Sequence, residues 1–123
     1  MCLIVREGGK IEIAKKDITT YKKVRILNNR WWSGIFYKEN IFRFNKLEKT
    51  VINLRIYYGE INEGFHSFKR LRYNYITSGK LVICIIPKGS EYCLGNGYIV
   101  SNQIIVFRTV FNYIKYKLWK RFR

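Results

Sequence analysis

Residues 81–89 read Leu-Val-Ile-Cys-Ile-Ile-Pro-Lys-Gly, and this stretch decides the fold class. A nearly continuous apolar run is typical of a strand inside a sheet, and the Pro-Lys-Gly that follows is typical of a turn that ends it. We therefore predict that residues 81–86 form the middle strand of a sheet.

Other short strands are predicted before and after this central run. Residues 2–5 and 11–13 flank Gly8-Gly9, a pair that can adopt the positive φ angles of a tight hairpin turn. Residues 19–27 interleave Tyr and β-branched side chains with Lys and Arg, which predicts a half-exposed strand with a basic outer face. A second hairpin is expected around Glu39-Asn40, and the remaining strands are expected at residues 35–37, 41–44, 51–58 and 103–107.

Two helices are predicted, one internal and one C-terminal. Residues 68–76 place apolar side chains at helical spacing, with Ser67 as the N-cap and Gly79 closing the segment. Residues 109–122 have a longer helical pattern, whose apolar stripe consists of Phe111, Ile114, Leu118 and Phe122. The expected fold is α+β: an antiparallel sheet of short strands with one short internal helix and a basic amphipathic C-terminal helix, all in a single domain over residues 1–123.

The charge of the chain indicates its class of partner. Twenty-four Lys and Arg residues against eight Asp and Glu give a formal net charge of +16 in 123 residues. This exceeds what solubility needs, and the self-repulsion costs stability unless an anion binds. With 48% hydrophobic and 17% aromatic residues the chain can still fill a core, so we expect a compact domain that binds a polyanion.

The C-terminal helix is the strongest candidate for a binding surface. At 100° per residue, the side opposite the apolar stripe combines cations with aromatic rings, and no acidic residue follows Glu91. Such a face can neutralise phosphates and stack on unpaired bases, as in proteins that bind single-stranded RNA. A solvated helix and a membrane-surface helix are the alternatives. The candidate residues on this side are Tyr113, Tyr116, Lys117, Lys120 and Arg123, with Trp119 and Arg121 at its margins.

Two further basic groups accompany the helix. The first lies on the predicted internal helix, where arginines can hold phosphates with two hydrogen bonds each; it consists of Lys69, Arg70 and Arg72, with Tyr73 and Tyr75 beside them. The second is Lys22, Lys23 and Arg25 on the strand predicted at residues 19–27. Each basic group by itself is explained by a helix or strand face that is exposed to water. The presence of all these basic groups in one small domain is less easily explained in this way.

Residues for catalysis or metal binding do not occur in a recognisable pattern. His66 is the only histidine, which excludes a mechanism that needs a histidine pair, and we interpret it as a structural residue. The three cysteines, Cys2, Cys84 and Cys93, are widely spaced and include no C-x-x-C pair for zinc. We predict that the chain is not an enzyme, has no cofactor or metal, does not insert stably into a membrane, and acts in the cytoplasm of a bacterial host cell.

Several short segments carry a resemblance. Met1-Cys2-Leu3-Ile4, Tyr21-Lys22, residues 64–68 and residues 86–92, through Ser101, resemble in order and spacing the small uncharacterised proteins carried by bacteriophages and prophages. The resemblance covers most of the chain and implies an accessory protein of a mobile element. A fainter similarity to ADP-ribosyltransferases involves the Gly-Phe turn and the strand that ends in Pro-Lys-Gly, but no candidate for the catalytic glutamate of that family follows Glu91.

The resemblance and the charge together suggest a function. Small phage proteins without an enzyme signature often act against host defence, and a basic member is suited to an RNA-guided effector nuclease complex. We therefore expect an anti-CRISPR-like inhibitor that binds RNA or a guide-RNA effector complex. The alternatives are a sponge for anionic nucleotide signals and a phage structural or packaging accessory protein.

Overall fold

The computed structural model describes residues 3–4, 9–34, 41–50, 53–56, 58–61, 63–69, 79–95 and 97–122. In this part of the chain, twelve strands precede one α-helix, α1 (Val110–Arg121). Ten of the strands form one antiparallel sheet, and β1 and β7 form a separate pair. The strands are β1 (Leu3–Ile4), β2 (Glu12–Ile13), β3 (Ile18–Ile26), β4 (Trp31–Gly34), β5 (Ile41–Arg43), β6 (Leu47–Lys49), β7 (Glu60–Ile61), β8 (Phe65–Phe68), β9 (Lys80–Ile86), β10 (Glu91–Leu94), β11 (Tyr98–Ser101) and β12 (Gln103–Val106).

The apolar run at residues 81–86 lies inside the sheet, as predicted. It belongs to β9, which pairs with β3 along one edge and with β12 along the other. The main path of the sheet runs β2-β10-β11-β8-β3-β9-β12-β6. After Ile86 the chain turns at Pro87, whose carbonyl accepts a hydrogen bond from the backbone N–H of Ser90 at 3.1 Å. The strands predicted at residues 19–27 and 103–107 are confirmed as β3 and β12.

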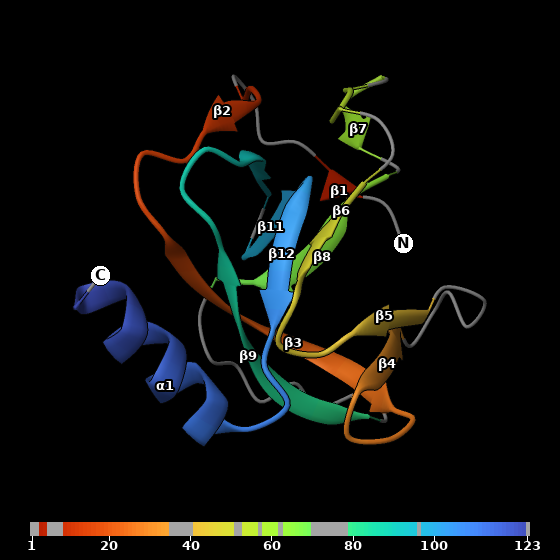
Figure 1. Cartoon of the computed structure of the whole chain (residues 1–123). Helices are drawn as coiled ribbons and strands as arrows, with labels where there is room; N and C mark the ends of the chain where they lie inside the picture. The colour runs from red at the N-terminus through yellow and green to blue at the C-terminus, as the bar shows by residue number, and fades with distance from the viewer. Residues whose placement is uncertain are drawn as a thin grey trace.

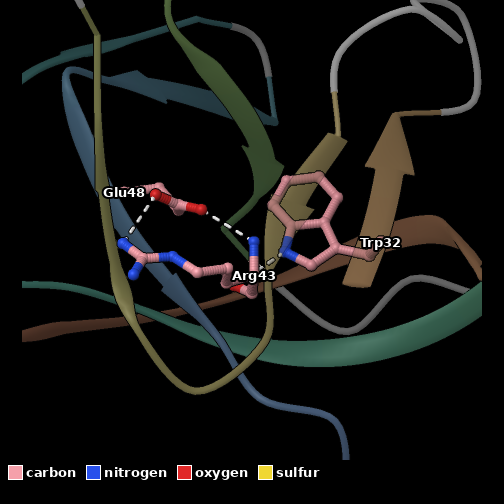
Figure 2. Close-up of polar contacts among 3 residues, drawn as sticks. All are labelled: Trp32, Arg43 and Glu48. Atoms are coloured by element: carbon pink, nitrogen blue, oxygen red, sulfur yellow. Dashed lines mark hydrogen bonds and ion pairs between the residues drawn. The ribbon is translucent and has the colours of Figure 1, made fainter. Parts of the chain in front are cut away.

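The sheet curls until two of its strands meet. One edge of β3 pairs with β9, and the other edge pairs first with β8 and then with β4, which continues into β5. On the opposite side, β12 pairs with β6. Figure 2 shows how β5 and β6 meet: Glu48 accepts a hydrogen bond from the backbone N–H of Arg43 at 2.7 Å and contacts its guanidinium at 3.4 Å. The strands β3, β4, β5, β6, β12 and β9 therefore surround one interior.

The main hydrophobic core fills this interior. Trp32 is its largest buried side chain, and its indole N–H donates to the carbonyl of Arg43 at 3.3 Å, which satisfies the one polar atom of the ring (Figure 2). Phe42 packs on Trp32 and on Phe65, with ring centroids 4.8 and 5.2 Å away. The buried members of this core are Val24, Trp32, Phe44, Phe65, Val82, Cys84, Ile104 and Val106.

A second, smaller core lies under β10 and β11. It consists of Leu54, Ile61, Cys93 and Val100. Gly64 sits against this core with φ of +135°, and a Cβ at this position would lie 2.6 Å from Cγ2 of Val100. Glycine is therefore required at residue 64 both for its backbone conformation and for the close approach of Val100.

The C-terminal helix packs on the outer face of β9 and β12 (Figure 1). Thr109 caps it by accepting a hydrogen bond from the backbone N–H of Asn112 at 3.1 Å. The predicted helix at residues 109–122 is thereby confirmed, with bounds that differ by one residue at each end.

The predicted internal helix does not begin where its pattern placed it. Ser67, expected as the N-cap, and Phe68, expected as the first helical residue, belong to β8 and pair with Ile99 and Tyr98 of β11. Phe68 therefore belongs to a strand whose inward and outward positions alternate, and the other residues of the predicted helical pattern, Leu71 and Tyr75, lie outside the described residues. No internal helix occurs in the part of the chain that the structure describes, and residues 70–78 lie outside it.

Three predicted strand assignments compare differently with the structure. The described segments on either side of Gly8-Gly9 pair with other strands: β1 pairs with β7 and β2 pairs with β10. Near the predicted second hairpin, β4 pairs with β5, whereas the strand predicted at residues 35–37 and the turn at Glu39-Asn40 lie outside the described residues. Residues 53–56 are not a strand, because Leu54 donates its backbone N–H to the Glu91 side chain rather than to a neighbouring strand.

Candidate functional site

The side of α1 that was predicted to bind RNA is the side that contacts the sheet. Tyr113 and Tyr116 pack on Phe107 with ring centroids 5.6 and 5.4 Å away, and both cover the small core formed by Ile85, Ile105 and Phe107. The Tyr113 hydroxyl lies 3.1 Å from Oγ1 of Thr19 on β3. Their rings are therefore used for packing inside the protein, on the face where base stacking was predicted, and stacking of these tyrosines on bases stays a prediction.

The apolar stripe of α1 faces solvent instead. Phe111, Ile114, Leu118 and Phe122 are 67%, 47%, 48% and 81% exposed, and the helix has no fully buried residue. We call these four residues the outer stripe. The helical periodicity of the sequence identified the stripe correctly. The helix, however, packs on the sheet with the side opposite to the stripe. The helix is held on the sheet by the rings of Tyr113 and Tyr116, with one hydroxyl contact, and by Lys120, which contacts the carboxylate of Asp17. These residues take the place of the aliphatic residues that were expected to pack.

That aspartate is the centre of a basic surface. Asp17 accepts a hydrogen bond from the backbone N–H of Lys88 at 2.8 Å through Oδ1, and its Oδ2 lies 3.7 Å from Nζ of Lys120. The backbone N–H of Gly89 donates to the Ala14 carbonyl at 2.8 Å, which joins the same two turns. Three segments therefore meet here: the turn before β3, the turn after β9, and the last turn of α1.

Each of these segments contributes exposed lysines. Lys15 and Lys16 lie on the first turn and Lys88 on the second, and Lys120 comes from the helix. We call these four lysines with Asp17 the Asp17 cluster. Asp17 is the one acidic residue of the cluster, and of the four ammonium groups that of Lys120 contacts it. The exposed Lys117 and Arg121 of α1 add further positive charge. Such an excess attracts a polyanion more strongly than scattered surface lysines do.

The other predicted binding residues are distributed differently. Trp119, Lys117 and Arg121 are exposed on α1, as the prediction requires. Lys69 is exposed directly after β8, and its backbone N–H donates to the Gly97 carbonyl at 3.3 Å. This contact ties Lys69 to the start of β11 and is not one of the contacts that form the Asp17 cluster. The predicted residues Arg70, Arg72, Tyr73 and Arg123 lie outside the described residues.

Three of the four cluster lysines were not among the predicted site residues. Lys15, Lys16 and Lys88 are 70 or more positions apart across the two turns, and only the pairing of β3 with β9 places the turns side by side. The available signal was weak: Lys15-Lys16-Asp17 and Pro87-Lys88-Gly89 each place lysine next to a turn. Nothing in their local spacing relates one turn to the other.

The third predicted basic group is divided by the strand that carries it. Lys22 points to the inner face of β3, where its ammonium lies 5.8 Å from the centre of the Trp32 ring and donates to the carbonyl of His66. Arg25 is exposed on the other face. Alternation along β3 therefore removes Lys22 from any shared basic surface with Arg25.

Burial shifts the pKa values of three neighbouring groups: Lys22, Cys84 and His66. Burial lowers the pKa of Lys22, and the nearby Cys84 thiol opposes this effect. Burial raises the pKa of Cys84 to about 12, so the thiol stays protonated at neutral pH and is a poor nucleophile. Burial, followed by the charge of Lys22, lowers the pKa of His66 to about 4. His66 is therefore neutral at pH 7, and its buried Nε2 has no hydrogen-bond partner among the residues that the structure describes.

The described residues contain neither a cluster of metal ligands nor a helix that could span a membrane. No three His, Cys, Asp or Glu side chains gather there in a way that could hold a metal ion. Within the same ranges, α1 falls short of the length and the apolar character that a bilayer-crossing helix requires.

The comparisons with known proteins add no relative. No family model matches the chain, and no curated protein or solved structure shows significant similarity to it.

Proposed function

We propose that this protein binds RNA, alone or within a guide-RNA effector complex, and that the Asp17 cluster is the principal contact. One observation carries the proposal: three chain segments with exposed lysines meet at Asp17, through the backbone N–H of Lys88 and the ammonium of Lys120. Phosphate groups of a flexible single strand can approach each ammonium in turn, and the release of counterions then drives binding.

The cluster supports a phosphate contact rather than recognition of bases. Lysine is a compact charge on a flexible chain and lacks the planar fork with which arginine reads a guanine edge. Trp119 and Arg121 lie on the exposed part of α1, where an indole ring can stack on a base and a guanidinium can form bidentate contacts. We therefore expect affinity with little sequence preference.

The proposed biological role is inhibition of host defence, in the manner of an anti-CRISPR protein in the bacterial cytoplasm. It is supported by the net charge of +16 and by the segment resemblance to phage-borne proteins. In this role the protein acts by occupying the RNA-containing surface of an effector nuclease, and it catalyses no reaction itself.

The test compares two triple variants with the same loss of charge. Lys15→Gln, Lys16→Gln and Lys88→Gln are combined in the first, and Lys46→Gln, Lys49→Gln and Lys80→Gln, all exposed lysines outside the cluster, in the control. Affinity for a short single-stranded RNA is measured over a range of salt concentrations. Three lost phosphate contacts should reduce the slope of log affinity against log salt by about 2 in the first variant only.

Equal losses in the two variants would contradict the proposal, because binding would then depend on net charge without a site. The inhibitory role has its own readout: target cleavage by a panel of purified guide-RNA effector nucleases, with and without the protein. Inhibition by the control variant but not by the cluster variant is expected. RNA binding without inhibition of any member of the panel would refute the role and leave the RNA contact standing.

A further inference from the structure

The outer stripe of α1 is an exposed apolar surface that does not pack the helix on the sheet. Its four residues follow one another at helical spacing on the side of α1 turned away from the sheet, because Tyr113 and Tyr116 occupy the opposite side. Val110 and Trp119, 65% and 56% exposed, widen it. Soluble monomers seldom expose a contiguous apolar surface of this kind unless something binds there.

Charge restricts what can bind there. The first turn of α1 contains no acidic residue, and none follows Glu91 in the chain. The exposed Lys115, Lys117 and Arg121 border the outer stripe. Pairing the stripes of two copies would bring these cations together with no carboxylate on either helix. A second copy of the chain is therefore disfavoured, and the partner should be anionic.

We propose that the outer stripe docks onto an anionic lipid surface. A helix with Phe, Leu and Trp on one face and Lys and Arg beside them is suited to the boundary between headgroups and acyl chains, which takes up apolar side chains and attracts cations together. Ile114 and Leu118 offer an RNA base no ring to stack on, whereas acyl chains accept them as readily as they accept Phe111 and Phe122.

The conformation of Lys115 agrees with this environment. Its Nζ lies over the Phe111 ring, 5.6 Å from the ring centre, so a cation and an apolar ring of the stripe lie side by side. At membrane surfaces, long basic side chains lie along apolar groups and keep their charged ends in water. Docking also requires no unfolding, since the residues that hold α1 on the sheet face the other way, and it leaves the protein peripheral to the bilayer.

The experiment uses the intact protein and two vesicle compositions. Co-sedimentation is measured with phosphatidylcholine vesicles and with vesicles that contain about one third phosphatidylglycerol, each at low salt and at about 0.5 M salt, where electrostatic adsorption is largely screened. We expect at least about tenfold stronger binding to the anionic vesicles, together with a blue shift of the tryptophan emission.

A triple variant separates docking from adsorption. Phe111→Ser, Leu118→Ser and Phe122→Ser replace three of the four stripe residues, and the control combines Ile13→Ser, Leu27→Ser and Ile41→Ser, which are exposed apolar residues outside α1. Affinity for anionic vesicles should fall at least about tenfold in the stripe variant and stay within about twofold in the control. The melting temperature of each variant is measured to verify folding.

Four results would overturn the proposal. In the first, the wild type does not bind anionic vesicles, and in the second, the stripe variant binds them as strongly as the wild type does. In the third, the wild type forms a dimer that the stripe variant does not form. In the fourth, neither protein binds vesicles and the stripe variant loses affinity for RNA. The last two would assign the stripe to a second copy or to RNA. The cluster variant of the RNA experiment should keep the stripe-dependent vesicle binding at high salt, so the two proposals can fail separately.

Discussion

The backbone N–H of Arg43 donates to Oε2 of Glu48 at 2.7 Å, and this contact joins β5 to β6 where the curled sheet meets itself. A strand partner would normally receive that N–H. Here a carboxylate receives it, and the second oxygen of the same carboxylate contacts the Arg43 guanidinium. The Arg43 carbonyl in turn accepts from Trp32, so the residue links the junction to the main core.

Glu48→Ala should therefore destabilise the protein. It removes the acceptor of the Arg43 N–H and the ion pair, and a lost hydrogen bond to a charged group makes the expected decrease in the free energy of unfolding about 1–2 kcal/mol. Urea unfolding measures it. Glu63→Ala, at an exposed glutamate, is the control and should change stability by less than about 0.5 kcal/mol. Equal effects would show that the β5–β6 contact contributes nothing specific.

Gly64→Ala should be one of the most damaging small substitutions. The added Cβ would lie 2.6 Å from Cγ2 of Val100 and 3.1 Å from the Ser101 carbonyl oxygen, at a φ of +135°. Steric overlap and backbone strain together should cost about 2–4 kcal/mol. At Gly59, with φ of +76° and open space around the Cβ, the same change should cost about 1 kcal/mol. Thermal unfolding of the two variants compares them directly.

The docking side of α1 can be tested by a pair of alanine substitutions. Tyr116→Ala removes a ring packed on Phe107 and should lower the free energy of unfolding by about 1–3 kcal/mol, somewhat less than for a fully buried aromatic residue. Phe111→Ala removes a ring that is mostly in solvent and should cost less than about 0.5 kcal/mol. The reverse order of the two effects would mean that the helix packs on its outer stripe.

Stability should fall as the pH is lowered from about 6.5 to about 4. The pKa of His66 is about 4 in the folded protein and about 6.5 in the unfolded chain, so between these values only the unfolded chain binds the proton. Protonation then favours unfolding by up to about 3 kcal/mol at the acid end. The free energy of unfolding of the wild type and of His66→Gln is measured across this range. If the difference between the two stays constant with pH, His66 does not titrate as described.

Some elements were predictable because local sequence determines them. The run at residues 81–86 is apolar at nearly every position, so it fits only inside a sheet, and the turn at Pro87 follows from proline itself. Thr109 and the residues after it form α1 because a capping side chain precedes a segment without Gly or Pro. Short strands such as β1 and β2 were located but mispaired, since a pair of residues carries no information about its partner strand.

What the sequence by itself determined was the excess of positive charge, the central strands, the terminal helix and the existence of its apolar stripe. Only the tertiary structure decided where the stripe points. Periodicity defines two faces of a helix, but the face that packs depends on what the sheet offers: a ring-sized apolar surface at Phe107, the Thr19 hydroxyl and the Asp17 carboxylate. These lie on other strands and turns, and the same pairing of β3 with β9 brings Lys88 beside Asp17 and creates the basic cluster.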